Sequence, residues 1–317
     1  MIRILANDGI HPDGKLLLEE AGYEVITEKV PQAQLASVIN DFDVIIVRSA
    51  TKIRQSLIDQ SNGRLKVVCR AGVGLDNIDV AYAKDNGISV FNTPAASSQS
   101  VAELVMGHIL TISRFLQVGN RTLVDGDFKV LKKQFSKGKQ IAGSTMGIIG
   151  FGRIGVALAG MALGMGMKVI VADPYVEKRE VPLFPKHFGL KSNAIIYTDK
   201  IEDVIRQADT LSMHVPAFEK PLIGAKELAM MKDDAIIVNA ARGGVIDEEA
   251  LLEALDSGKL MGAGLDVFVG EPTPDKRLLN HPKVSVSPHI GASTVTAQSM
   301  IGRELADIIL GFFGELE

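Results

Sequence analysis

Met146-Gly147-Ile148-Ile149-Gly150-Phe151-Gly152-Arg153-Ile154-Gly155 is the stretch that decides the fold of this chain, because an apolar run breaks into spaced glycines and resumes as an amphipathic pattern. Its glycines fit G-x-G-x-x-G, in which the first allows a strand-to-helix turn and the second lets a pyrophosphate approach the backbone. The third lets the helix pack on the strand. Since a helix N-terminus presents unpaired N–H groups, the stretch predicts a dinucleotide-binding turn.

The residues that follow the glycines indicate which dinucleotide binds. Residues 168–172 form a second apolar run, and it ends at Asp173. A carboxylate there binds the ribose hydroxyls and repels the 2′-phosphate of NADP. Pro174 and Tyr175 come next and supply no arginine for such a phosphate, so the sequence predicts NAD. The alternative, a glycine-rich turn in an ordinary βαβ unit, stays open.

Composition excludes several classes of protein. The chain has 317 residues, 46% of them hydrophobic, which is enough for two domains. A net charge of −4 argues against a broad surface for nucleic acid or anionic membrane. One cysteine, Cys69, excludes an intramolecular disulfide, and the six histidines are scattered, so no metal site is expected. The N-terminal apolar run is too short for a signal peptide and no run approaches a membrane span, so we expect a cytoplasmic protein.

Short apolar, β-branched runs alternate with helical segments at the start of the chain. Strands are predicted at residues 2–6, 23–27, 44–47, 66–69 and 89–91. This alternation predicts a parallel sheet with helices on both faces. It stops at Pro94, because proline disfavours helix at the preceding residue, and a domain boundary is expected there.

A second doubly wound unit is expected around the glycine motif. Its further strands are predicted near Val169 and at residues 210–214, 235–239, 262–267 and 283–287. A long apolar helix at residues 101–118 precedes the motif and is expected in the core or at a subunit interface. A last helix at residues 294–313 has no later strand to pair with and is expected to pack on the first domain.

The predicted fold is therefore α/β with two doubly wound domains. Residues 97–288 are expected to form a Rossmann domain that binds NAD. This domain is inserted in a discontinuous, flavodoxin-like substrate domain of residues 1–96 and 289–317.

Three polar side chains follow predicted strands of the second unit: Arg242, Glu271 and His289. A guanidinium can hold a carboxylate bidentately and polarise an adjacent carbonyl. A histidine can exchange a proton near neutral pH, and a carboxylate on its other nitrogen fixes its tautomer. Each residue alone is also typical of a solvated surface. Together, at the edge where ligands of open α/β sheets bind, they predict a catalytic site.

The first domain carries a candidate anion site at the same edge of its own sheet. Arg70 opens the turn Arg70-Ala71-Gly72-Val73-Gly74, and Arg48 follows a neighbouring strand. Glycines allow successive N–H groups to converge on an anion, and the arginines add charge. The alternative is a plain turn.

These motifs together resemble the D-isomer-specific 2-hydroxyacid dehydrogenases and, within that family, the phosphoglycerate dehydrogenases. The matching segments are residues 47–51, 70–77, 92–94, 146–155, 239–244, 265–268, 271–272 and 288–293. Their order and spacing match over essentially the whole chain. The resemblance implies NAD-dependent oxidation of 3-phospho-D-glycerate to 3-phosphohydroxypyruvate in serine biosynthesis. A hydroxypyruvate or glyoxylate reductase is the alternative in the same family, and an NADH-binding corepressor is a distant one.

The resemblance also implies roles for individual residues. Arg242 would bind and polarise the 2-oxo acid, His289 would be the acid or base, and Glu271 would orient that histidine. The implied cofactor residues are Gly150, Gly152, Arg153, Ile154, Gly155, Asp173, Val215, Ala241, Asp266 and Gly291. The implied substrate residues are Gly72 and Val73 through their N–H groups, Arg48 and Arg70 at a distal phosphate, and Arg242 and His289 at the reacting end.

The helix at residues 101–118 is similar to the family's dimerisation arm, which implies a homodimer. The substrate would be a small phosphorylated hydroxy acid, with no nucleic acid or membrane partner. The sequence ends at Glu317 without the serine-sensing domain of many phosphoglycerate dehydrogenases, so feedback through such a domain is not expected. Relatives place a phosphate-binding basic residue near residues 129–133, but the alignment needs a gap, so the roles of Lys132 and Lys133 stay open.

Overall fold

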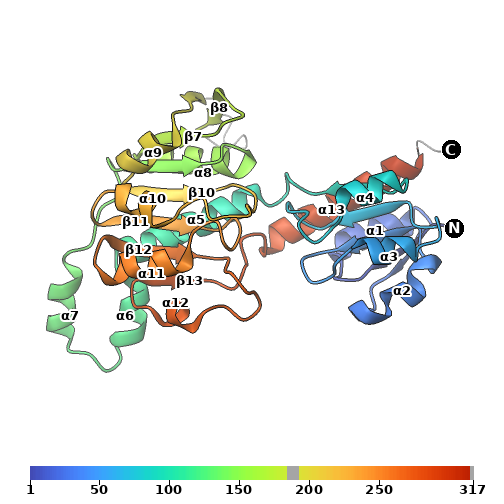
Figure 1. The fold of residues 1–317 in the computed structure, drawn as a ribbon, viewed down its shortest axis with the longest axis horizontal. Coiled ribbons are helices and arrows are strands. Elements are labelled where there is room, and N and C mark those ends of the chain that lie inside the picture. The colour runs from blue at the N-terminus through green and yellow to red at the C-terminus, as the bar shows by residue number, and fades with distance from the viewer. Residues whose placement is uncertain (184–192, 315–317) are drawn as a thin grey trace. The chain divides into compact units, whose positions relative to one another are not determined.

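The chain forms two units that each contain a parallel sheet (Figure 1). This computed structural model describes residues 1–183 and 193–314. Unit 1 comprises Met1–Ser97 and Ala292–Glu317, and unit 2 comprises Ser98–Gly291. Residues 289–291, which the sequence analysis assigned to the first domain, thus lie in unit 2. The reason is that all three backbone N–H groups donate to Asp266: His289 to its carbonyl at 2.8 Å, and Ile290 and Gly291 to its carboxylate at 2.8 and 2.9 Å.

Unit 1 is built on a five-stranded sheet in the order β2-β1-β3-β4-β5. Its strands are β1 (Arg3–Ala6), β2 (Glu24–Ile26), β3 (Val44–Val47), β4 (Val67–Arg70) and β5 (Ser89–Asn92). All neighbouring strands are parallel, and the order is that of the flavodoxin-like fold, as predicted. Val44 and Ile46 point into one core and Ile45 and Val47 into the other, which explains why the strand is apolar throughout.

Helices cover both faces of this sheet. On one face lie α1 (Pro12–Glu20) and α13 (Val295–Gly314). The other face is covered by α2 (Leu35–Val38), η2 (Ile39–Asp41), α3 (Gln55–Asp59) and α4 (Val80–Asp85), with the short turn η1 (Gln32–Gln34) leading into α2. The C-terminal helix therefore packs on the first domain, as predicted. It approaches α1 closely, since a Cβ atom on Gly14 would lie 2.2 Å from the carbonyl oxygen of Gly302.

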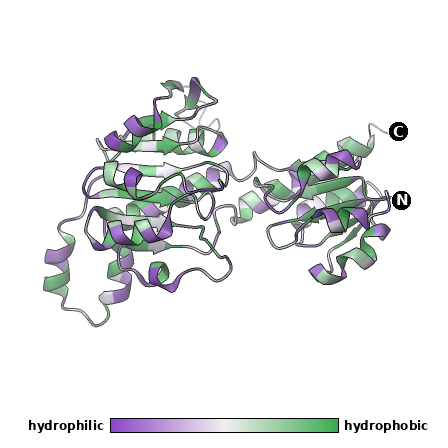
Figure 2. Ribbon diagram, viewed as in Figure 1, coloured by the Kyte–Doolittle hydropathy of each residue, from purple (hydrophilic) through white to green (hydrophobic). Residues whose placement is uncertain are grey.

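Unit 2 is built on a six-stranded parallel sheet in the order β13-β12-β11-β10-β6-β7. Its strands are β6 (Thr145–Ile149), β7 (Lys168–Ala172), β10 (Thr210–Met213), β11 (Ala235–Asn239), β12 (Leu260–Leu265) and β13 (Val284–Val286). The chain runs from β6 outward to β7 and resumes on the other side of β6 at β10. A strand order that reverses in this way creates the switch point at which doubly wound sheets bind ligands. Figure 2 shows hydrophobic residues gathered along the strands.

Two helical layers enclose the second sheet. On one face lie α5 (Ser98–Ser113) and α8 (Arg153–Gly164). On the other lie α9 (Ile201–Gln207), α10 (Ala225–Met230), α11 (Glu248–Asp256) and α12 (Lys276–Asn280). A small antiparallel pair, β8 (Lys178–Pro182) and β9 (Asn193–Tyr197), was not predicted, because β8 is rich in charged residues.

The helix predicted at residues 101–118 is in fact two helices. After α5, the chain bends by 63° into α6 (Leu116–Thr122) and continues to α7 (Phe128–Phe135). Phe115 is left-handed at φ 57°, and its ring stacks on that of Phe135 at 5.7 Å, which draws this residue out of the helix. Within residues 1–183 and 193–314, no single helix is long and apolar enough to cross a membrane, and α5 and α6 pass that test only as a bent pair.

The glycine contact between α1 and α13 can be tested by adding one methyl group. Gly14→Ala is expected to lower the free energy of unfolding by about 1–3 kcal/mol, because the helices must separate to admit the Cβ atom. Gly311→Ala in α13 is the control, since nothing lies within 4 Å of its Cβ position, and it is expected to raise that free energy by about 0.5–1 kcal/mol. Urea unfolding followed by circular dichroism measures both, and equal effects would contradict the close contact.

Candidate active site

The glycine motif forms the turn between β6 and α8. Gly150 is left-handed at φ 92°, and a Cβ atom there would lie 2.3 Å from the carbonyl oxygen of His214. A Cβ atom on Gly155 would lie 2.3 Å from the carbonyl oxygen of Gly150, so this glycine lets the helix pack on the turn. Nothing lies within 4 Å of the Cβ position of Gly152. Two glycines thus permit protein contacts, and the third leaves backbone open to a ligand, as a pyrophosphate requires.

Asp173 is held against this turn at the end of β7. One carboxylate oxygen accepts from the N–H of Phe151 at 2.7 Å, and the other accepts from the N–H of Tyr175 at 2.9 Å. Each carboxylate oxygen has a further lone pair, so the group can also accept from ribose hydroxyls. Arg153 and Ile154 begin α8, and Val215 approaches the turn with a methyl group 3.0 Å from the Cβ position of Gly150. These residues fit a dinucleotide.

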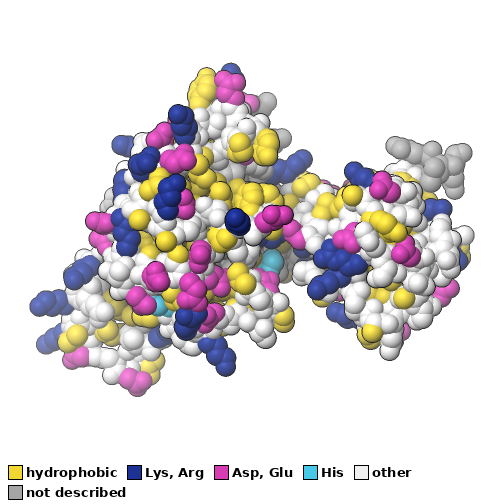
Figure 3. Space-filling view, viewed as in Figure 1, with side chains coloured by type: hydrophobic (Ala, Val, Ile, Leu, Met, Phe, Trp, Pro, Cys, Tyr) yellow, Lys and Arg dark blue, Asp and Glu magenta, His cyan; other side chains and the backbone are white. Residues whose placement is uncertain are grey.

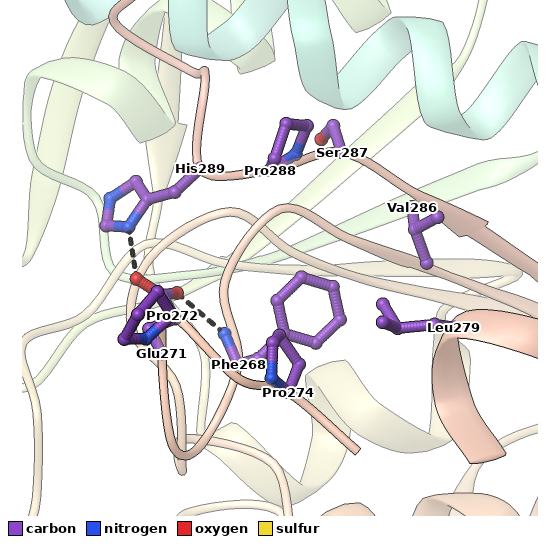
Figure 4. A pocket seen from close by; sticks show the side chains of 9 residues that line it. All are labelled: Phe268, Glu271, Pro272, Pro274, Leu279, Val286, Ser287, Pro288 and His289. Carbon is purple, nitrogen blue, oxygen red and sulfur yellow. Dashed lines mark hydrogen bonds and ion pairs between the residues drawn. The ribbon is translucent and has the colours of Figure 1, made fainter. Parts of the chain in front are cut away.

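His289 and Glu271 form a hydrogen-bonded pair (Figure 4). Nδ1 of His289 lies 2.8 Å from Oε2 of Glu271, whose Oε1 accepts from the N–H of Phe268 at 2.9 Å. A carboxylate accepts hydrogen bonds, so Nδ1 is the donor, and in the neutral form of the ring Nε2 then has the lone pair. The pair is part-exposed, with 42% of the histidine side chain accessible. This arrangement suits a general base whose charged form is stabilised by the carboxylate.

A cavity of about 350 Å³ lies beside the pair. Apolar side chains make up most of its wall, among them Phe268, Pro272, Pro274, Leu279, Val286 and Pro288 (Figure 4). Glu271 and His289 line the same cavity. The pair therefore lines a mostly apolar cavity while both side chains remain accessible to solvent.

Arg242, which the sequence predicts to be catalytic, lies in a turn after β11 that hydrogen bonds of Asn239 stabilise. The buried side chain of Asn239 donates to the carbonyl of Arg242 at 2.8 Å and accepts from the N–H of Ala241 at 3.0 Å. A Cβ atom on Gly243 would lie 2.1 Å from the carbonyl oxygen of Phe268, so this turn packs directly on the segment that leads to Glu271. Sequence reasoning gave Asn239 no role, although a polar residue at the end of an apolar strand was the available signal.

Asp266 and Gly291, both predicted to bind the cofactor, contact each other. Asp266 is 1% exposed, and its carboxylate accepts from the N–H of Ile290, the N–H of Gly291 and the hydroxyl of Ser287. A Cβ atom on Gly291 would lie 3.2 Å from that carboxylate. Asp266 thus anchors the segment of His289 besides its expected role at the nicotinamide.

In unit 1, the predicted Arg70 folds over its own turn. A Cβ atom on Gly72 would lie 1.6 Å from Nη1 of Arg70, and Gly72 has φ 141°. The N–H of Gly72 donates to the carbonyl of Arg70 at 2.9 Å. In this conformation that N–H is engaged inside the turn, which differs from its expected use on a substrate carboxylate. Val73 follows with 37% of its surface exposed.

Arg48 lines a separate cavity of about 290 Å³ within unit 1. Asp8, His11 and Gln298 line it too, and Nη2 of Arg48 donates to Oε1 of Gln298 at 2.5 Å. Hydrogen bonds from the N–H groups of Arg48 and Thr51 hold the pKa of Asp8 below its ordinary value, although burial opposes them. Gln298 was missed from the sequence, where its one signal was a polar residue in the first turn of an apolar helix.

Comparison with known proteins agrees with this geometry. A model of the NAD-binding domain of D-isomer-specific 2-hydroxyacid dehydrogenases matches residues 106–291. The chain is 42% identical to a hydroxypyruvate reductase of Thermotoga maritima over 98% of both chains. It is also 42% identical to a D-3-phosphoglycerate dehydrogenase of Methanocaldococcus jannaschii, over 98% of this chain and 57% of that relative.

A solved structure has the same fold. The crystal structure of the TT0316 protein of Thermus thermophilus is 29% identical and matches with a TM-score of 0.84, over 98% of this chain and 96% of that one. The chain spans just over half the length of the phosphoglycerate dehydrogenase it matches, and nearly all of the reductase. The chain belongs to the family of D-isomer-specific 2-hydroxyacid dehydrogenases and carries that family's NAD-binding domain.

Proposed function

We propose that this protein transfers a hydride between NAD and a phosphorylated 2-hydroxy acid, and that it oxidises 3-phospho-D-glycerate to 3-phosphohydroxypyruvate. The observation that carries the proposal is the 2.8 Å contact between His289 and Glu271. It lies in the unit whose sheet also carries the glycine turn and Arg242. A base, its orienting carboxylate and a carboxylate-binding guanidinium are the groups that such a reaction requires.

The residues act by moving one proton and holding one carboxylate. Bound NAD supplies the hydride acceptor. Nε2 of His289 would take the hydroxyl proton of the substrate, and Glu271 would stabilise the resulting imidazolium through Nδ1. Arg242 would hold the substrate carboxylate and polarise the carbonyl that forms. In the reverse direction the protonated His289 would be the donor.

The choice of a phosphorylated substrate rests on unit 1. Arg48 and Arg70 both lie at the carboxyl edge of its sheet, and Arg48 lines a cavity with Gln298. A guanidinium and an amide suit the oxygen atoms of a phosphate. An unphosphorylated acid would offer Arg48 no anionic group to bind.

A hydroxypyruvate reductase is the second candidate. The full-length match to the Thermotoga maritima hydroxypyruvate reductase favours it, since the phosphoglycerate dehydrogenase is matched over only 57% of its length. Both reactions use the same base and the same hydride acceptor. They differ only in whether the substrate carries a phosphate, so the arginines of unit 1 are what distinguishes them.

We also propose a homodimer, supported by the apolar surface of α6 and α7. Figure 3 shows hydrophobic side chains among basic ones at that end of unit 2, at the lower left. The exposed hydrophobic residues there are Leu116, Leu123, Val124, Phe128 and Val130. Such a cluster is typical of a protein interface.

The role of His289 can be tested by truncation. His289→Ala should lower kcat roughly 10²- to 10⁴-fold, the usual contribution of a general acid or base. His281→Ala is a matched control in unit 2, because that histidine pairs with Asp256 at 3.2 Å, and turnover should stay near that of the wild type. NADH oxidation with the oxo acid measures both. Turnover of His289→Ala within a few-fold of wild type would refute the assignment.

The substrate can be decided with three acids and one substitution. With NADH, we expect higher kcat/KM on 3-phosphohydroxypyruvate than on hydroxypyruvate or glyoxylate. Arg48→Ala should raise KM for the phosphorylated acid about 10- to 100-fold, the worth of a hydrogen bond to a charged group, and leave KM for hydroxypyruvate nearly unchanged. Arg54→Ala, which removes an arginine paired with Asp79, is the control. A wild-type preference for the unphosphorylated acids would favour the reductase.

The dimer can be tested by charging its proposed interface. Wild type should sediment as two chains of 34.0 kDa, and Phe128→Glu as one. Phe128 begins α7, where a carboxylate is favourable to the helix, so the substitution should affect association and not folding. Val295→Glu, which changes an exposed first residue of α13, is the control and should remain a dimer. A wild-type protein that sediments as one chain at micromolar concentration would disprove the proposal.

A further inference from the structure

A buried network of hydrogen-bonded polar side chains connects α5 to the segment that contains His289. His108 of α5 is 4% exposed. Its Nδ1 lies 2.8 Å from the hydroxyl of Ser285, and its Nε2 lies 3.0 Å from the hydroxyl of Ser287. The two serines are two residues apart on and just beyond β13, so both point to one face of the sheet. Ser287 in turn donates to the carboxylate of Asp266 at 2.6 Å.

The hydrogen atoms in this network can be assigned by starting at Asp266. The hydroxyl of Ser287 donates its single hydrogen to the carboxylate of Asp266. The Ser287 oxygen can then only accept from Nε2 of His108, which therefore carries the hydrogen. Burial lowers the pKa of His108, although the charge of Asp266 opposes this, so the ring is neutral at pH 7 and Nδ1 accepts from Ser285. Every bond then points from Ser285 through His108 and Ser287 to Asp266.

The surrounding backbone makes room for the imidazole. A Cβ atom on Gly264 of β12 would lie 2.7 Å from Cβ of His108 and 3.0 Å from its Cγ. A side chain at this position would therefore collide with His108. A buried imidazole is costly unless its nitrogens are hydrogen-bonded, and here both are.

The segment that Asp266 binds contains the proposed base, His289. His289 has a left-handed backbone at φ 54°, which is unfavourable for a residue with a side chain. The three N–H bonds from residues 289–291 to Asp266 maintain that conformation. The orientation of the Asp266 carboxylate therefore determines where the segment of His289 lies.

We propose that His108 is a positioning residue for the hydride transfer: through Ser287 it orients the Asp266 carboxylate, and thereby holds residues 289–291 in the conformation that presents His289. This inference rests on the function proposed above. It adds a residue from α5, outside every motif of the sequence, to the groups on which turnover depends.

Two amide substitutions separate this role from simple core packing. The amide nitrogen of His108→Gln reaches about as far as Nε2 and can still donate to Ser287. The shorter His108→Asn reaches only as far as Nδ1, on the side of Ser285. Both lose the imidazole, and Asn also has one methylene fewer than Gln, so thermal unfolding of both variants measures how much stability each loses from packing. Ser285→Ala removes the hydrogen bond at Nδ1 of His108 and is a further control.

The expected effect falls on turnover. His108→Asn should lower kcat about tenfold, the equivalent of a net hydrogen bond of about 1.4 kcal/mol, with KM for the oxo acid nearly unchanged. His108→Gln and Ser285→Ala should keep most of the wild-type kcat. Equal values of kcat for the Gln and Asn variants would overturn the proposal.

Amide hydrogen exchange of the cofactor-free protein provides a readout that does not depend on activity. The amides of Ile290 and Gly291 should exchange several-fold faster in His108→Asn than in His108→Gln, because both donate to Asp266. Equal exchange would overturn the positioning role even if the variants differ in kcat. If the wild type reduces none of the three oxo acids, the proposed function fails, and the exchange comparison still decides whether His108 orders this segment.

Discussion

The burial of one carboxylate, that of Asp266, is the constraint on which the site depends. A buried charge is tolerated only where donors surround it, and this one takes three hydrogen bonds from Ser287, Ile290 and Gly291. Those bonds join the end of β12 to the segment after β13. They keep residues 289–291 in unit 2 and hold the backbone of His289 in a left-handed conformation.

The parallel sheets explain why the other candidate catalytic and cofactor-binding residues lie in turns. Both faces of each sheet are covered by helices, so the strands are mostly apolar and most of the charged candidate residues follow the strand ends. Asp173, Arg242 and Glu271 all follow strands of unit 2. Glycines at 150, 155 and 243 allow these turns to pack against neighbouring backbone, which is what gives short loops defined positions.

In the proposed function, hydride and proton transfer would depend on unit 2, and recognition of the phosphate would depend on unit 1. The family assignment and the contact of His289 with Glu271 concern unit 2, where the hydride and the proton would be transferred. The proposed preference for a phosphate depends on Arg48 and its neighbours in unit 1. Two relatives with different names are each 42% identical to the chain, so sequence identity alone cannot choose between their substrates.

The sequence by itself determined the fold class, the strand positions of both sheets and the candidate catalytic residues, because apolar periodicity and the glycine spacing are local signals. Only the tertiary structure decided where α5 ends, since Phe115 stacks on Phe135, 20 residues later. It also brought Gln298 into hydrogen-bonding contact with Arg48, and His108 with Ser287. Those partners are distant in sequence, and no local pattern encodes a hydrogen bond between residues that only folding brings together.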